Sequence, residues 1–248
     1  MIQPWRATCM QVYCNLVNSA RNRDEALAII NRSLDRWATL IRGTARDGGR
    51  HLLLFPEFCL TGFPLTESAK EWIDKACIEI PGPVTERLQK EAQRAKIWIG
   101  ANAYERDPEW PGRYFNTSFL ISPAGDVVLK YRRINTVQTG SPHDFMDRYL
   151  DRYGIEGTFP VAKTDFGNIA MMPCGEIMYP EAARMFMLLR RHKISFDGAL
   201  NHSLSHPLQH HTLTHSRRFQ VRRGVSCSKP AAFAQQRSRL RAASKRNP

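Results

Sequence analysis

The chain has 248 residues, of which 42% are hydrophobic, so it is long enough to bury one substantial core. No apolar run reaches the roughly 18 residues that a membrane-spanning helix needs, and the first residues lack the basic and apolar regions of a secretion signal. The six cysteines show no metal-ligand spacing, which favours reduced thiols. These features predict a soluble, cytoplasmic protein without a membrane partner.

The net charge of +13 is concentrated at the C-terminal end of the chain. Residues 217–248 contain ten Lys or Arg and no Asp or Glu. Clustered arginines can neutralise phosphates, but this segment has only Phe219 and Phe233 for stacking and no recognition motif, which argues against a nucleic-acid partner. We interpret residues 1–220 as one domain and residues 221–248 as a basic, poorly ordered tail.

The N-terminal half alternates strand-like and helix-like patterns. Apolar residues at three- and four-residue steps between positions 26 and 41 predict a helix with one buried face. The turn Pro81-Gly82-Pro83 precedes a second predicted helix. Predicted strands occupy residues 5–13, 51–55 and 97–103, and the second helix covers residues 84–95.

The second half begins with a predicted hairpin, whose strands, residues 114–122 and 127–131, flank a Pro-Ala-Gly-Asp turn. Residues 135–165 show no clear period and are interpreted as a long loop with a short helix near residues 145–153. An apolar strand over residues 168–172 leads to Pro173 and Cys174, and a helix is predicted over residues 179–189. Cys174 is therefore expected at a strand-to-helix turn.

Three chemically useful side chains lie at or just beyond the ends of predicted strands: Glu57, Lys130 and Cys174. In layered α/β proteins this edge gathers functional sites. A cysteine near a helix start is shifted toward the thiolate, a carboxylate can take and return its proton, and an ammonium supplies fixed charge. Taken alone, each residue could be structural; together they predict a cysteine-dependent site.

The segments around these residues resemble the three motifs of the carbon–nitrogen hydrolase (nitrilase) superfamily. LLLFPEFCLTGF is similar to its glutamate motif, FNTSFLISPAGDVVLKYRRI to its lysine motif, and MMPCGEIMYPEAAR to its cysteine elbow. The resemblance covers about residues 5–189. It implies an α/β fold, a four-layer α-β-β-α sandwich, with Cys174 as nucleophile, Glu57 as general base and Lys130 as oxyanion stabiliser. It also implies a thioacyl-enzyme intermediate, no metal, no cofactor, and a homo-oligomer.

The residues after Cys174 leave the subclass open. Backbone N–H groups here, Gly175 among them, are candidates for receiving an oxyanion. Glu176 is either a partner that orients Lys130 or a first-turn acid favoured by the helix dipole. Tyr179-Pro180-Glu181 resembles amidase-like members, whereas Cys-Gly-Glu resembles nitrilase-type members. The resemblance favours hydrolysis of a small amide with release of ammonia; a small nitrile is the alternative substrate.

Two further groups of residues carry no assigned role. Family members often have a second glutamate between the lysine and the cysteine, and none of the acids in this region forms a convincing match. Clustered histidines near the C-terminus are interrupted by Pro207 and lack a completing ligand, so a metal site is not expected. The acids are Asp144, Asp147, Asp151 and Glu156; the histidines are His202, His206, His210, His211 and His215.

The C-terminal region departs from the family pattern. Residues 196–201 are a weak counterpart of the strand that usually follows, and the later helix and closing strands have no match from residue 221 onward. We therefore expect a sandwich that is incomplete at its C-terminal edge, with exposed apolar surface. A truncated, non-catalytic relative is the second alternative to an amidase.

Overall fold

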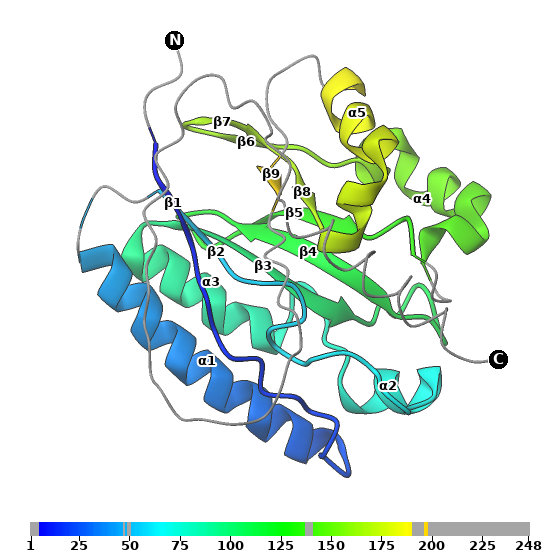
Figure 1. Ribbon diagram of the computed structural model, residues 1–248, viewed down its shortest axis with the longest axis horizontal. Helices are drawn as coiled ribbons and strands as arrows, with labels where there is room; N and C mark the ends of the chain where they lie inside the picture. The colour runs from blue at the N-terminus through cyan, green and yellow to red at the C-terminus, as the bar shows by residue number, and fades with distance from the viewer. Residues whose placement is uncertain (1–4, 47, 49–50, 137–140, 190–195, 198–248) are drawn as a thin grey trace, which may run out of the picture.

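The computed structural model describes residues 5–46, 48, 51–136, 141–189 and 196–197. Its centre is a five-stranded sheet in the order β1-β2-β3-β4-β5 (Figure 1). β1, β2 and β3 run parallel, β4 is antiparallel to β3, and β5 is antiparallel to β4. The strands are β1 (Ala7–Cys9), β2 (Leu52–Leu54), β3 (Trp98–Glu105), β4 (Phe115–Ile121) and β5 (Val127–Arg132).

One face of this sheet is covered by α1 (Arg23–Arg46) and α3 (Pro83–Ala95) and is called the α1/α3 face below (Figure 1). α1 forms because its apolar residues recur on one side, and that side is buried against the sheet. The predicted helices and strands of this half are present, but the strand expected over residues 5–13 is limited to the three residues of β1. The buried apolar residues of α1 are Ala26, Ile30, Leu34, Trp37 and Ile41.

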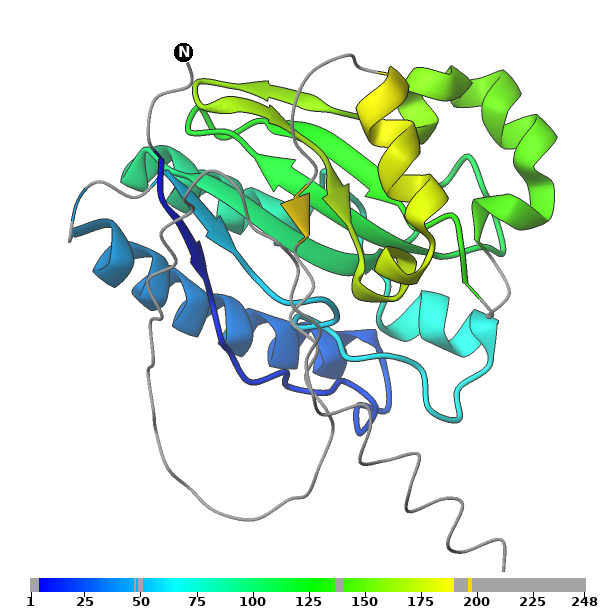
Figure 2. The same ribbon diagram turned by 45° about the horizontal axis from the view of Figure 1, so that its top comes forward.

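The opposite face carries shorter strands and is called the α5 face. Its apolar cluster joins Leu129 and Tyr131 of β5 to Phe186 of α5 (Pro180–Leu189). β6 (Ala162–Thr164) pairs with β7 (Gly167–Ile169), and β8 (Met171–Met172) pairs in parallel with β9 (Phe196–Asp197). Figure 2 shows these pairs on the side of the sheet opposite α1. The predicted α-β-β-α layering is thus confirmed, with two strand pairs as the second β layer.

The region expected to be a long loop holds more helix than predicted. A 3-10 turn, η1 (Pro142–Phe145), leads into α4 (Met146–Thr158), which is kinked at Gly154. An aromatic cluster packs α4 against the sheet, and the Trp110 indole N–H donates to the Tyr153 hydroxyl at 3.1 Å. The cluster comprises Phe115, Phe145 and Tyr149, with Trp110 and Tyr153 packed against it.

α2 (Ala69–Lys75) was not predicted. Ser68 begins this helix with a capping box: Glu71 N–H donates to the Ser68 hydroxyl, and the Glu71 carboxylate accepts from Ser68 N–H. Trp72 is its buried residue. The Ser-x-x-Glu spacing is a start signal that can be read from the sequence, but one buried side chain in seven residues gives too little periodicity to indicate a helix.

The exposed surface of the cysteine side is apolar in part. Five large apolar side chains of η2 (Cys174–Met178) and α5, with the residue between them, are at least 40% exposed. No helix among the described residues is long and apolar enough to cross a membrane. The predicted tail, the histidine cluster and the incomplete C-terminal edge lie outside the described residues. The five side chains are Ile177, Met178, Tyr179, Met187 and Leu188.

Candidate active site

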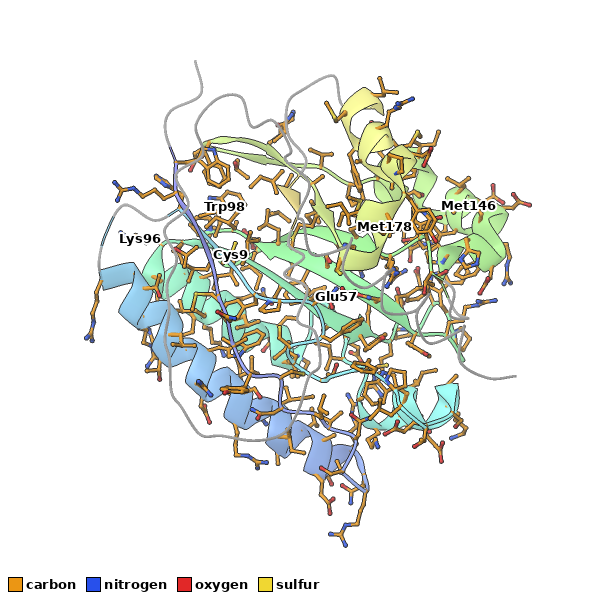
Figure 3. The ribbon with its side chains drawn as sticks, viewed as in Figure 1. Cys9, Glu57, Lys96, Trp98, Met146 and Met178 are labelled. Atoms are coloured by element: carbon orange, nitrogen blue, oxygen red, sulfur yellow. The ribbon has the colours of Figure 1, made fainter. Side chains whose placement is uncertain are left out.

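Glu57 lies three residues beyond β2, in a turn that other segments hold in place. Phe58 adopts a left-handed backbone conformation with φ of 61°, uncommon for a side chain of this size. Its N–H donates to the Asn102 side chain at 3.2 Å, and its carbonyl accepts from Gly62 N–H at 2.8 Å. These hydrogen bonds hold the backbone of the turn that carries Glu57, which lies near the middle of the molecule in Figure 3.

The Glu57 carboxylate contacts three other segments. Asn116 on β4 donates its amide N–H to Oε1 at 2.6 Å, and the Cys174 backbone N–H donates to Oε2 at 3.2 Å. Arg133 Nη1 lies 3.8 Å from Oε1. The Asn102 amide donates to Asn116 Oδ1 at 2.6 Å, so the Asn116 amide must present its N–H to the carboxylate. We call Glu57, Asn116, Arg133 and Cys174 the Glu57 cluster.

Cys174 follows β8 after one residue, as predicted, and is partly exposed. The element that it begins is the five-residue 3-10 turn η2, and α5 starts only at Pro180. The N-terminus of α5 is therefore not at the thiol. The Glu57 carboxylate accepts from the Cys174 backbone N–H, so it lies beside this turn.

Glu176 is fully buried, and its carboxylate hydrogen-bonds the turn that carries Cys174 to the segment after β5. Its Oε1 accepts backbone N–H groups from Ile134 at 2.9 Å and Asn135 at 2.7 Å. Burial raises the pKa of Glu176 above its ordinary value, and these N–H groups partly oppose that rise. Of the two sequence interpretations, the contacts favour an orienting role, but the segment that it orients carries Arg133.

Lys130 does not join this cluster. It pairs with Phe119 of β4 in register, whereas its neighbours Leu129 and Tyr131 point to the α5 face. Because side chains alternate along a strand, the Lys130 ammonium reaches the α1/α3 face. There it donates to Glu105 at 2.7 Å and to the Ile80 carbonyl at 3.0 Å. The structure thus corrects the expected placement of Lys130.

The carboxylate that holds Lys130 also holds a second cation. Arg132 donates to both oxygens of Glu105 at 2.8 Å, and the Thr117 hydroxyl donates at 2.7 Å. Glu105 and Arg132 are 1% and 2% exposed, so this pair is fully buried. Burial opposes the charge of Arg132, but the hydrogen bonds with Glu105 and Asp107 raise its pKa above the ordinary value. We call Glu105, Lys130 and Arg132 the Glu105 cluster.

Arg133 is the cation that sequence reasoning missed. It follows the last residue of β5, and its backbone N–H donates to the Asn116 carbonyl at 2.8 Å. It lies an odd number of positions after Lys130, so alternation sends it to the other face. Asn102 and Ser118, polar residues of β3 and β4 that hydrogen-bond each other, are a sequence signal that could have indicated this face.

The four acids between Lys130 and Cys174 that the sequence left unassigned have no role in the Glu57 cluster. All four are exposed on η1 or α4, and Asp144 pairs with His143 at 2.9 Å. Among the described residues, no group of three His, Cys, Asp or Glu side chains is arranged to hold a metal ion. The acids are Asp144, Asp147, Asp151 and Glu156.

The structure is thus a layered α/β architecture in which the Glu57 carboxylate accepts from the Cys174 N–H. The family model of carbon–nitrogen hydrolases matches residues 28–225, so the chain belongs to this family. It is similar to formamidases of Bacillus cereus and Bacillus anthracis, each 28% identical over 163 residues. That match covers 64% of this chain and 45% of each relative, so the chain spans less than half the length of these curated relatives.

Solved structures show the same fold. An amidase from Nesterenkonia sp. is 16% identical and superposes with a TM-score of 0.54, covering 80% of this chain and 66% of that one. Saccharomyces cerevisiae Nit3, a member of the nitrilase superfamily, is 16% identical with a TM-score of 0.55, covering 80% and 63%. A carbon–nitrogen hydrolase from Helicobacter pylori G27 is 18% identical with a TM-score of 0.55, covering 79% and 60%.

Proposed function

We propose that this hydrolase cleaves the carbon–nitrogen bond of a small amide through a thioester on Cys174, releasing ammonia. The observation that carries the proposal is the 3.2 Å hydrogen bond from the Cys174 N–H to the Glu57 carboxylate. It brings a carboxylate to the residue that bears the thiol, although the two are 117 positions apart in the chain. Similarity to formamidases and amidases supports an amide substrate.

The reaction runs in two halves. Glu57 takes the thiol proton as Cys174 Sγ attacks the amide carbonyl, and the tetrahedral intermediate collapses by breaking the carbon–nitrogen bond. Glu57 returns that proton to the leaving nitrogen, so ammonia departs and the thioester remains. Water then attacks the thioester while Glu57 takes a proton from it, and Glu57 returns that proton to Cys174 Sγ as the carbon–sulfur bond breaks and the carboxylic acid forms. One amide and one water give one acid and one ammonia.

The assay is ammonia release by purified full-length protein over a panel of short amides and the matching nitriles. Cys174→Ala and Glu57→Gln should each lower kcat/KM by at least about 10³-fold, because they remove the nucleophile and the proton acceptor. Cys9→Ala is the matched control, since Cys9 is also partly exposed but lies on β1, and it should retain activity. Labelling by iodoacetamide should occur first at Cys174.

Each alternative has its own result. Activity on the nitriles but not on the amides would replace the amide proposal with a nitrile one. A folded protein that releases no ammonia and shows no selective labelling of Cys174 would instead be the non-catalytic relative. Oligomerisation is a separate prediction, and size-exclusion chromatography with light scattering tests it.

A further inference from the structure

The guanidinium of Arg133 lies directly over the peptide that follows the nucleophile. A Cβ built on Gly175 would overlap Arg133 Nη2 and stand 3.0 Å from its Cζ. On the same side chain, Nη1 lies 3.8 Å from Glu57, and Nε donates to the Asn135 carbonyl at 2.9 Å. The side chain is 19% exposed. Arg133 thus spans the space between the carboxylate and the Cys174–Gly175 peptide.

The absence of a side chain at position 175 has a steric explanation and no conformational one. Gly175 is not among the glycines with positive φ, so its backbone is open to any L residue. A Cβ at position 175 would overlap Arg133 Nη2, at the far end of that side chain, more closely than real Cβ contacts allow. Arg133 can swing away at little cost to the fold, so occupation of position 175 would move the cation without unfolding the protein.

We propose that Arg133 is the fixed positive charge of the reaction site, in the role expected of Lys130, and that Gly175 stays bare to let the guanidinium reach it. This inference rests on the proposed function. The carbonyl attacked by Cys174 must lie within bonding distance of its sulfur, close to the peptide that Arg133 covers. Charge that develops on its oxygen would then face a cation held in place by Asn135 and Glu176.

The test is a double-mutant cycle of Arg133→Lys and Gly175→Ala, with Arg133→Met as a third single variant. Arg133→Met should lower kcat/KM by about 10²–10³-fold through loss of the charge. Gly175→Ala should cost about 30-fold in the otherwise wild-type protein and about threefold or less when combined with Arg133→Lys, because an ammonium has no planar group to displace. Arg133→Lys alone should cost about tenfold.

A second readout is independent of turnover. The rate of alkylation of Cys174 by iodoacetamide, measured over a pH series from acid to alkaline, reports the thiolate fraction. Arg133→Met and Gly175→Ala should move this profile to higher pH, because both take the cation away from the site. Lys130→Met should leave it in place. Circular dichroism and thermal unfolding confirm that each variant is folded.

The outcomes separate the two proposals. An equal cost of Gly175→Ala on both backgrounds, or an unchanged alkylation profile in Arg133→Met, overturns the Arg133–Gly175 inference even if the wild type is an active amidase. If the alkylation profiles shift as expected but no panel compound is hydrolysed, the pair stands and the proposed substrate class fails. If Gly175→Ala does not fold, Arg133→Met alone decides the role of the cation, since it introduces no clash.

Discussion

Two charged clusters take their cations from β5 and the residue after it, and they use similar residue types in opposite ways. In the Glu105 cluster a fully buried carboxylate receives two cations and a hydroxyl through hydrogen bonds of 2.7–2.8 Å. In the Glu57 cluster the cation is 3.8 Å from the carboxylate, and an amide N–H and a backbone N–H donate to that carboxylate. The first is arranged as a tight ion-pair network, and the second leaves the arginine outside hydrogen-bonding distance of the carboxylate.

The difference shows how one strand separates structural charge from reactive charge. Lys130 and Arg132 point to the α1/α3 face, where the layers are already packed, and Arg133 reaches the α5 face beside Cys174. A hydrogen-bonded buried ion pair is costly to break, so it fixes position. A cation that does not hydrogen-bond a carboxylate is less neutralised by it, so it can stabilise a negative charge that forms nearby more strongly. The following predictions test this division, starting with the largest effect on stability.

Glu105→Ala should be the most destabilising change in either cluster. It removes the bidentate partner of the Arg132 guanidinium, which is 2% exposed, and leaves Asp107 as its remaining carboxylate partner. Removing one partner of a buried ion pair costs up to about 3–5 kcal/mol. Urea unfolding followed by circular dichroism measures the loss. Glu105→Gln keeps the shape and an acceptor, so it should lose less. Equal stability of Glu105→Ala and wild type would show that this network does not hold the sheet.

Glu176→Ala should come next, at about 2–3 kcal/mol, because two backbone N–H groups lose their acceptor. Glu176→Gln keeps an acceptor oxygen and should stay within about 1 kcal/mol of wild type at neutral pH. The same unfolding experiment compares both variants. A larger loss in Glu176→Gln than in Glu176→Ala would mean that the charge, and not the acceptor, holds this turn.

Glu176 also predicts a pH dependence of stability. Its folded-state pKa is raised above the ordinary value of 4.5, so the folded state binds the proton more tightly than the unfolded state. The contribution of this residue to stability is therefore full below pH 4.5 and is lost as pH rises through the folded-state pKa. Glu176→Gln should remove that slope. If the difference in unfolding free energy between the two proteins stays constant across this interval, the raised pKa is wrong.

Lys130→Met should have the smallest effect, about 1 kcal/mol or less, because the Lys130 side chain is 32% exposed and Glu105 keeps Arg132. On the sequence interpretation the same change should abolish ammonia release; on the structural one kcat/KM should fall less than about threefold, against the large loss in Arg133→Met. A loss of activity in Lys130→Met as large as in Arg133→Met would return Lys130 to the site.

Much of the fold followed from the sequence, because periodicity along a single element is visible there. The buried face of α1, the β4–β5 hairpin and the position of Cys174 after β8 were all predicted. The start of α4 was expected as a short helix near residues 145–153. Its continuation to Thr158 was missed, because Gly154 and Gly157 disfavour a helix there.

The site was harder to predict, because which face of β5 meets β8 depends on tertiary packing. The run Lys130-Tyr131-Arg132-Arg133 offers three cations, and strand alternation places two on one face and one on the other. Alternation alone does not tell which face holds Glu57. In the structure Asn116 identifies that face: its side-chain amide donates to Glu57, and its backbone carbonyl accepts from the Arg133 N–H.

The aromatic cluster that packs α4 has an optical consequence. Trp110 packs on Phe145 with ring centroids 4.7 Å apart, and its indole N–H donates to Tyr153. Because indole emission depends on the polarity and hydrogen bonding around the ring, the fluorescence of Trp110 should report whether α4 is seated. With the other four tryptophans replaced by phenylalanine, a red shift on α4 release would make this helix a built-in spectroscopic probe.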